Sequence, residues 1–156
     1  PVNEYGRTKV EAETHVLSHP RGTVLRIPVL VGEGPGFIEQ MVAALRSGAP
    51  EEVDDVLVRH PTWTVDVAGV CAWLIQEGAS GIWHASSEQG GTRYQLTKRV
   101  GEILGLSSDH LIPSQQVLKR KAARPLNTKL SPRKLLQAGG PACRELEDTL
   151  SALGIW

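Results

Sequence analysis

The sequence of 156 residues contains only two cysteines, Cys71 and Cys143, and they lie far apart in the chain. Two separated cysteines provide neither a disulfide framework nor the paired spacing of a zinc site. The chain also has no excess of either charge, because lysine plus arginine and aspartate plus glutamate both number 17. Proteins that bind nucleic acid normally carry a basic excess, so the composition disfavours that class.

No apolar run is long enough to span a bilayer, because charged residues interrupt every candidate segment. The first residues do not have the pattern of a signal peptide. Hydrophobic residues make up 40% of the chain and charged residues 22%, as in globular proteins that are soluble in water. These observations predict a protein of the reducing cytoplasm with no membrane partner.

The chain also lacks an initiating methionine and enough strands to complete a sheet. It begins with Pro1, and its first segment already has the pattern of a helix. Only residues 23–32 and 80–86 are convincing buried strands, and two parallel strands are too few for a stable sheet. We therefore expect a fragment or a processed chain, whose sheet is completed by strands absent from this sequence.

Helical patterns and strand patterns alternate along the chain, which predicts an α/β fold with parallel pairing. A short strand is expected at 56–58, and residues 107–127 are expected to be mostly irregular. Apolar spacing, capping residues and helix stops predict helices at 4–19, 37–48, 65–78, 92–106, 131–139 and 142–155.

The stretch NEYGRTK, residues 3–9, places Tyr5 and Lys9 one helical turn apart. A free phenol has a pKa of about 10 and exchanges protons poorly near neutral pH, but an ammonium group one turn away favours the phenolate. Such a pair can protonate a carbonyl oxygen while hydride reaches the carbonyl carbon. Tyr94 and Lys98 have the same spacing, so spacing alone does not distinguish a proton-transfer pair from an ordinary surface helix.

The residues around Tyr5 distinguish the two pairs. YGRTK, followed by the strand pattern VLRIPVLVGE, resembles the active-site helix and the next strand of the extended short-chain dehydrogenase/reductase families. Further segments follow in the order of the dTDP-4-dehydrorhamnose reductase-like branch, namely FIEQMVAALRSG, RHPTWTVDVAGV, SGIWHASSEQGGTRYQLTKRVGEILGL and ARPLNTKLSPRKL. That branch includes sugar-nucleotide reductases and the regulatory beta subunit of methionine adenosyltransferase, and the resemblance covers essentially the whole chain.

The resemblance implies the C-terminal portion of a Rossmann-like, doubly wound parallel sheet and a small α/β substrate-side region, without the N-terminal nucleotide-binding strands. It implies a Rossmann-like part at 1–85 with a substrate-side excursion around 33–60, a substrate-side subdomain at 86–140, and a C-terminal helix at 141–156. The glycine-rich turn for the pyrophosphate, the residue that selects NAD or NADP, and a Ser or Thr at the substrate carbonyl would precede residue 1. We therefore expect this chain alone to be inactive.

The resemblance also implies roles for individual residues. Tyr5 would be the general acid/base, and Lys9 would tune its acidity and hydrogen-bond the nicotinamide ribose. The backbone at Pro28 and Val29 would lie beside the nicotinamide of NADP or NAD in the full-length parent. Arg124 would contact a phosphate of the substrate.

Three functions remain open at this point. The first is a fragment of an NAD(P)H-dependent reductase that acts on a keto group of a nucleotide-linked sugar. The second is a non-catalytic, NADP-binding regulatory subunit that docks onto a partner enzyme through the segment 124–135. The third is an isolated fragment with no activity of its own.

Several other patterns have ordinary explanations. GEGPG at 32–36 has Phe37 where the dinucleotide fingerprint needs a third glycine, so it is interpreted as a turn. The basic cluster KRKAAR at 119–124 is interpreted mainly as a solvated loop. His15 and His19 lie one turn apart but have no evident third ligand, so no metal site is predicted.

Overall fold

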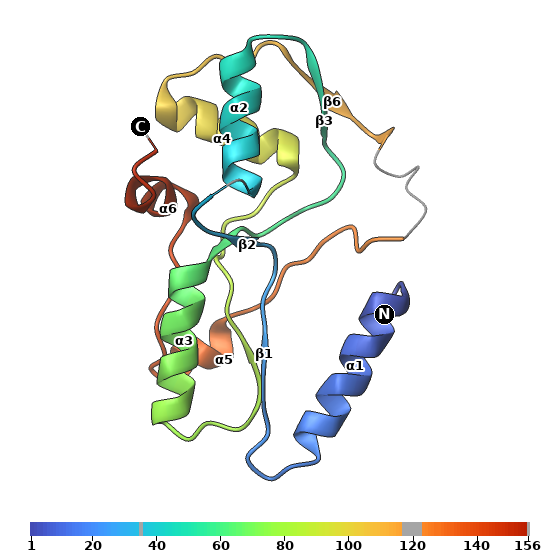
Figure 1. Cartoon of the computed structure of the whole chain (residues 1–156), viewed down its shortest axis with the longest axis vertical. Helices are drawn as coiled ribbons and strands as arrows, with labels where there is room; N and C mark the ends of the chain where they lie inside the picture. The colour runs from blue at the N-terminus through green and yellow to red at the C-terminus, as the bar shows by residue number, and fades with distance from the viewer. Residues whose placement is uncertain (35, 117–122, 156) are drawn as a thin grey trace.

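The computed structural model describes residues 1–34, 36–116 and 123–155. The elements are α1 (Glu4–Leu17), β1 (Thr23–Arg26), β2 (Leu30–Val31), α2 (Phe37–Ser47), β3 (Glu51–Asp54), β4 (Thr62–Trp63), α3 (Thr64–Gln76), β5 (Gly81–His84), α4 (Arg93–Leu104), β6 (Leu111–Ser114), α5 (Arg133–Gln137) and α6 (Leu146–Ala152). Figure 1 shows α2, α4 and α6 at one end of the molecule, α3 and α5 at the other, and α1 to one side. No helix of the described residues is long and apolar enough to cross a membrane.

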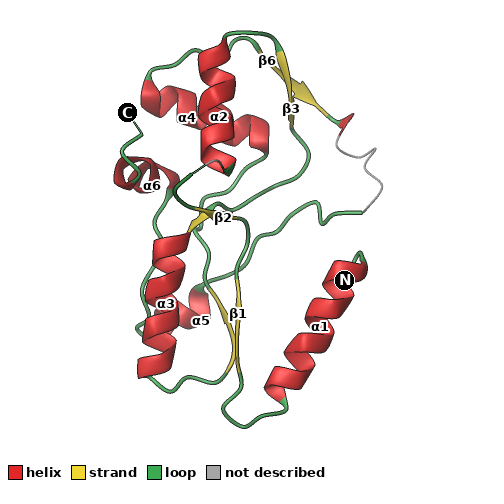
Figure 2. Cartoon of the chain, viewed as in Figure 1, coloured by secondary structure: helices red, strands yellow, loops and turns green. Residues whose placement is uncertain are grey.

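The named strands form three pairs, β1 with β5, β2 with β4 and β3 with β6, and each pair is parallel (Figure 2). Parallel partners need crossover connections, and α2 and α3 both lie in the connection from β1 to β5. The parallel pairing and the alternation of strands with helices confirm the expected α/β class.

The prediction of one continuous buried strand at 23–32 is wrong in two respects. The segment divides into β1 and β2, and all four residues of β1 are only half-buried. Pro28 between the strands has no amide hydrogen to donate, while the carbonyl of Val29 accepts a hydrogen bond from the amide of Thr62 at 2.9 Å. Strand β1 pairs with β5 alone among the named strands, and this agrees with its partial burial.

The strand expected at 56–58 is also misplaced, because the strand in this region is β3. The carboxylate of Asp54 accepts hydrogen bonds from the amides of Val56 and Leu57, at 2.9 and 3.2 Å, and this turn ends the strand. The partner of β3 is β6, which lies in the region expected to be irregular.

The C-terminal helix expected at 142–155 is shorter than predicted, since α6 begins at Leu146. The two residues before it have long-range contacts instead. The amide of Arg144 donates to the carboxylate of Asp66 at 2.7 Å, and the carboxylate of Glu145 accepts from the amides of residues 88 and 89. These contacts hold the chain against the first turn of α3 and the segment after β5, before α6 starts.

The apolar interior consists of two clusters. One joins α2, α4 and α6 and includes the fully buried side chains of Met41, Val100 and Leu150. The other joins α3, β5 and α5 around Trp83, which contacts Trp73 edge to face with ring centroids 5.8 Å apart. Trp73 and Trp83 thus lie in this apolar cluster, and Trp156 lies outside the described residues.

Helix α1 contributes no buried residue to either cluster. The Asn3 side chain caps its start by accepting a hydrogen bond from the amide of Gly6 at 2.9 Å. Within the described residues, Glu13 and Asn3 form polar contacts that connect α1 and its cap to the rest of the chain. Arg26 of β1 donates two hydrogen bonds to the carboxylate of Glu13, at 2.9 and 2.5 Å, and Asn3 donates to the carbonyl of Ala123 at 2.8 Å.

Candidate functional site

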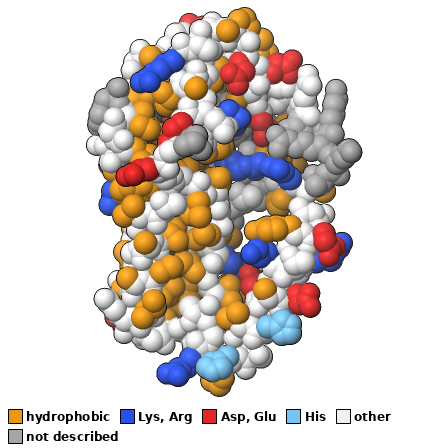
Figure 3. Space-filling view, in the orientation of Figure 1, with side chains coloured by type: hydrophobic (Ala, Val, Ile, Leu, Met, Phe, Trp, Pro, Cys, Tyr) orange, Lys and Arg blue, Asp and Glu red, His pale blue; other side chains and the backbone are white. Residues whose placement is uncertain are grey.

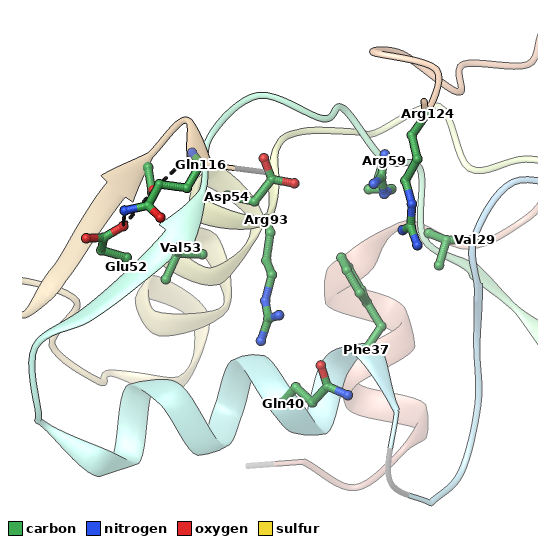
Figure 4. Close-up of a pocket in the computed structure, with 11 residues that line it drawn as sticks. Val29, Phe37, Gln40, Glu52, Val53, Asp54, Arg59, Arg93, Gln116 and Arg124 are labelled. Carbon is green, nitrogen blue, oxygen red and sulfur yellow. Dashed lines mark hydrogen bonds between the residues drawn. The ribbon is translucent and has the colours of Figure 1, made fainter. Parts of the chain in front are cut away.

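Two adjoining cavities lie where the start of α1, the segment after β1 and the segment around residue 124 meet. The smaller has a volume of about 380 Å³ and is lined by Asn3, Tyr5, Val29, Arg59, Arg124, Pro125 and Thr128. The larger, of about 610 Å³, shares Val29, Arg59 and Arg124 with it and extends between α2, β3 and the start of α4 (Figure 4). Segments far apart in the sequence therefore enclose one continuous candidate site.

Tyr5 lies in the first turn of α1, where 70% of the residue is exposed, and it lines the smaller cavity. The Lys9 ammonium lies 5.4 Å from the centroid of the Tyr5 ring, within the range of a cation–π contact. Lys98 lies 5.6 Å from the ring centroid of Tyr94 in the same way, so the local geometry of the two pairs is nearly identical.

The surroundings of the two tyrosines differ. Tyr94 is half-buried and packs against the cluster formed by α2, α4 and α6. Tyr5 instead shares its cavity with Arg59 and Arg124. A proton donor next to cations is the arrangement that suits an anionic substrate with a carbonyl group.

The structure brings together three of the five expected site residues, Tyr5, Val29 and Arg124, at one cavity. Lys9 lies beside Tyr5 without lining the cavity, and Pro28 is half-buried next to Val29. Of the basic cluster at 119–124, residues 119–122 lie outside the described residues, so the structure tests this interpretation only at Ala123 and Arg124.

Two arginines of the site were missed by sequence reasoning, Arg59 and Arg93. Arg93 is the first residue of α4, and in Figure 4 its side chain extends toward Gln40 of α2. Arg59 and Arg124 lie beside Val29 in the same view, and Phe37 points toward them. Nothing in the spacing of either residue indicates a site, although Arg59 is the first residue of the segment RHPTWTVDVAGV quoted above.

The charge of the site is divided between its two ends. At the β3–β6 end, the carboxylate of Glu52 accepts hydrogen bonds from Ser114 and Gln116 at 2.8 and 2.9 Å. Arg93 lies between that end and Arg59 and Arg124 (Figure 4), and neither Arg93 nor Arg124 belongs to an ion pair within the described part of the chain. Figure 3 shows basic side chains along the hollow beside α1. Arginines without a carboxylate partner in a cavity favour the binding of an anion.

The segment at 32–36 gives no sign of a phosphate loop in its described residues. Gly34 has a φ of 91°, which a turn requires of it, and the amide of Gly36 donates to the carboxylate of Glu39 at 3.0 Å. An acidic side chain thus occupies this helix start, where a phosphate would have to bind. Among the described residues, no three histidine, cysteine or acidic side chains form a group that could hold a metal ion.

The family model of the RmlD substrate binding domain matches residues 1–153. The chain is 34% identical to methionine adenosyltransferase 2 subunit beta from Danio rerio over 142 residues, which are 83% of this chain and 44% of that protein. It is 35% identical to a dTDP-4-keto-6-deoxy-D-glucose reductase from Streptomyces niveus over 122 residues, or 75% and 42% of the two chains. The chain therefore spans less than half the length of each of these relatives.

Solved structures show the same fold. A dTDP-4-dehydrorhamnose reductase ortholog from Clostridium acetobutylicum is 26% identical and superposes with a TM-score of 0.84, over 98% of this chain and 55% of that one. A dTDP-4-dehydrorhamnose reductase from Bacillus anthracis, solved in complex with NADP, is 22% identical with a TM-score of 0.85, over 99% and 56%. The fold thus corresponds to about half of a Rossmann-like reductase.

Proposed function

This chain belongs to the family of the RmlD substrate binding domain, and on that premise we propose that it is part of an NAD(P)H-dependent reductase of nucleotide-linked keto sugars. The observation that carries the proposal is the cavity shared by Tyr5, Val29, Arg59 and Arg124. It combines a proton donor with cations suited to a phosphorylated substrate. We place the parent among the extended short-chain dehydrogenase/reductases of the cytoplasm.

In the proposed reaction the hydroxyl group of Tyr5 gives its proton to the carbonyl oxygen of the substrate as hydride adds to the carbonyl carbon. The product is an alcohol, and the bound nicotinamide cofactor, NADPH or NADH, supplies the hydride. Lys9 holds a positive charge beside the Tyr5 ring and stabilises the phenolate left by proton transfer. Lys9 would also bind the nicotinamide ribose, together with Tyr5.

The cofactor would lie against the backbone of Pro28 and Val29. This placement fits the structure in one respect, because Val29 and Tyr5 line the same cavity and could face one bound group from two sides. Arg124 lines both cavities and would hold a phosphate of the substrate. The carbonyl to be reduced would then lie in the smaller cavity, next to Tyr5.

We also propose three functional parts of the chain. They are a Rossmann-like part at residues 1–85 with a substrate-side excursion around 33–60, a substrate-side subdomain at 86–140, and a C-terminal helix at 141–156. The two apolar clusters support a cofactor side around α3 and β5 and a substrate side around α2 and α4. Helix α2 lies within the excursion, and α6 adds to the substrate-side cluster through Leu146 and Leu150.

A steady-state assay of the full-length protein tests this proposal. We expect oxidation of NADPH or NADH in the presence of a dTDP-4-keto-6-deoxy sugar. Because Arg124 would bind substrate and transition state alike, Arg124→Ala should raise KM about tenfold or more with little change in kcat. Arg133→Ala, an exposed arginine on α5, is the matched control. Absence of cofactor oxidation refutes the reductase, and an unchanged KM removes Arg124 from the site.

A regulatory subunit is the second candidate, and the identity to methionine adenosyltransferase 2 subunit beta favours it. In that case the segment 124–135 would dock onto a catalytic partner, and Tyr5 would have no chemical role. The full-length protein and its Tyr5→Phe variant should then bind a purified methionine adenosyltransferase catalytic subunit equally in size-exclusion chromatography. Separate elution of the two proteins would refute this candidate.

A further inference from the structure

We propose that His60 is a positioning residue, whose buried ring against Gly90 fixes the guanidinium group of Arg59 at the boundary of the two cavities. There Arg59 would act with Arg93 and Arg124 on a polyanionic part of the substrate, such as a diphosphate. The inference rests on the proposed function for the identity of the substrate. The contacts from which we argue it involve neither Tyr5 nor Lys9.

The ring of His60 occupies the space that a side chain at position 90 would need. His60 is 4% exposed, and a Cβ atom placed on Gly90 would lie 2.4 to 2.6 Å from three atoms of the imidazole. The Nδ1 atom is buried and has no hydrogen-bond partner within the described ranges. An unpaired buried nitrogen is unfavourable for folding, so stability alone does not account for a histidine here.

The backbone next to this contact joins Arg59 to the start of α4. Arg59 and Gly91 form an antiparallel bridge in which each amide donates to the other carbonyl, at 2.8 and 3.0 Å. The hydroxyl group of Thr92 donates to the carboxylate of Asp55 at 2.6 Å, and Arg93 follows directly. The segments that carry Arg59 and Arg93 are thus held in one register, and the ring of His60 lies against Gly90, next to this bridge.

The same segment holds the chain that carries Arg124. The amide of Val58 donates to the carbonyl of Leu126 at 2.8 Å, and the amide of Thr128 donates back to the carbonyl of Val58 at 3.3 Å. Residues 55–60, which carry Arg59, therefore contact both of the segments that carry the other two arginines. A shift of the His60 ring would move Arg59 relative to the other two arginines, since Arg59 is its direct neighbour in the chain.

Three guanidinium groups from three segments suit a ligand with more than one negative charge. Arginine binds phosphate oxygens through two parallel hydrogen bonds, and this geometry demands accurate placement. A guanidinium group that is displaced from this geometry binds phosphate more weakly, although its charge is still present. This outcome separates a positioning role for His60 from a merely structural one.

Gly90→Ala tests the inference in the full-length protein. The added methyl group must displace the His60 ring, and we expect the dissociation constant for inorganic pyrophosphate, measured by calorimetry, to rise about tenfold or more, as for one lost charge-assisted hydrogen bond. Gly69→Ala is the matched control, because a Cβ atom there meets no other atom within 4 Å. Equal pyrophosphate affinity of the Gly90 and Gly69 variants overturns the inference.

A double-mutant cycle connects the effect to Arg59. Arg59→Ala should weaken binding in the wild-type background but add little in the Gly90→Ala background, because the arginine is already misplaced there. Fully additive losses would show that Gly90 acts elsewhere and would overturn the inference. If Gly90→Ala does not fold, His60→Asn replaces it. This variant should also bind pyrophosphate about tenfold or more weakly, and an unchanged affinity would overturn the inference.

Turnover separates this inference from the proposed function. With a keto-sugar substrate, Gly90→Ala should raise KM and leave kcat close to the wild-type value. If no keto sugar is reduced while pyrophosphate binding still depends on Gly90 and Arg59, the reductase proposal fails and the positioning role stands. If keto sugars are reduced with an unchanged KM in Gly90→Ala, the positioning role fails and the reductase proposal stands.

Discussion

The two cysteines differ in their surroundings, and we expect them to differ in reactivity. Burial raises the pKa of the Cys143 thiol to about 11, and the nearby carboxylates of Asp66 and Glu145 add to the effect. Cys71 is exposed on α3. Because the thiolate is the nucleophile, iodoacetamide at pH 8 should modify Cys71 in the native protein and Cys143 only after denaturation.

Mass spectrometry of the native and denatured protein measures this difference. The Cys71→Ser variant provides the control. Cys143 is the cysteine that remains in it, and it should stay unlabelled in the native form. Equal labelling rates for both cysteines in the native wild-type protein would contradict the raised pKa and the half-buried position of Cys143.

At the residue scale, the sequence predicted part of the candidate site. The resemblance of NEYGRTK and ARP to known motifs pointed to Tyr5 and Arg124, and the structure places both at one cavity. Arg59 and Arg93 escaped prediction for a physical reason. They come together through long-range contacts, the bridge between residues 59 and 91 and the hydrogen bond from Thr92 to Asp55, and no local pattern encodes such pairing.

The attachment of α1 to β1 depends on the ion pair between Glu13 and Arg26. Hydrogen bonding from Arg26 lowers the pKa of Glu13 below its usual value of 4.5, against the opposing effect of burial. A lowered folded-state pKa means that the pair stabilises the fold above pH 4.5 and that this contribution is lost as the pH falls through the folded-state pKa. The Arg26 and Glu13 side chains are 41% and 20% exposed, so solvent screening limits the effect to about 1 kcal/mol or less.

Glu13→Gln should therefore lower the free energy of unfolding by about 1 kcal/mol or less at pH 7, and the difference from wild type should shrink toward pH 3. Urea denaturation at the two pH values measures it. Glu11→Gln, at an exposed position on the same helix, is the matched control and should show no such pH dependence. A Glu13→Gln effect of equal size at both pH values would contradict the assignment.

At the element scale, long periodic segments were predictable and short paired strands were not. The helices α2, α3 and α4 follow from apolar spacing and from glycines at 48, 78 and 105 that adopt positive φ just beyond their ends. Strand β3 reads EEVD, which has no alternation typical of a half-buried strand, and its partner β6 lies far along the chain. Long-range pairing, rather than local preference, makes these two segments strands.

At the scale of the whole molecule, α1 differs from every other long helix. It has no buried residue, and Tyr5, Val10, Val16 and Leu17 are all exposed along its length. Figure 3 also shows apolar side chains on the surface over the region of α3. The site nevertheless needs α1, because it carries the proposed proton donor, while the arginines come from residues 55–60 and from the two segments that these residues contact.

The most direct test of the central claim compares the two tyrosines that have a lysine four residues later. Full-length wild-type, Tyr5→Phe and Tyr94→Phe proteins are assayed for NAD(P)H oxidation with a dTDP-4-keto-6-deoxy sugar. Loss of a general acid should lower kcat about 100- to 10,000-fold in Tyr5→Phe, while Tyr94→Phe should keep the wild-type kcat. Wild-type turnover in Tyr5→Phe, or equal losses in both variants, would contradict the assignment of Tyr5 as the proton donor.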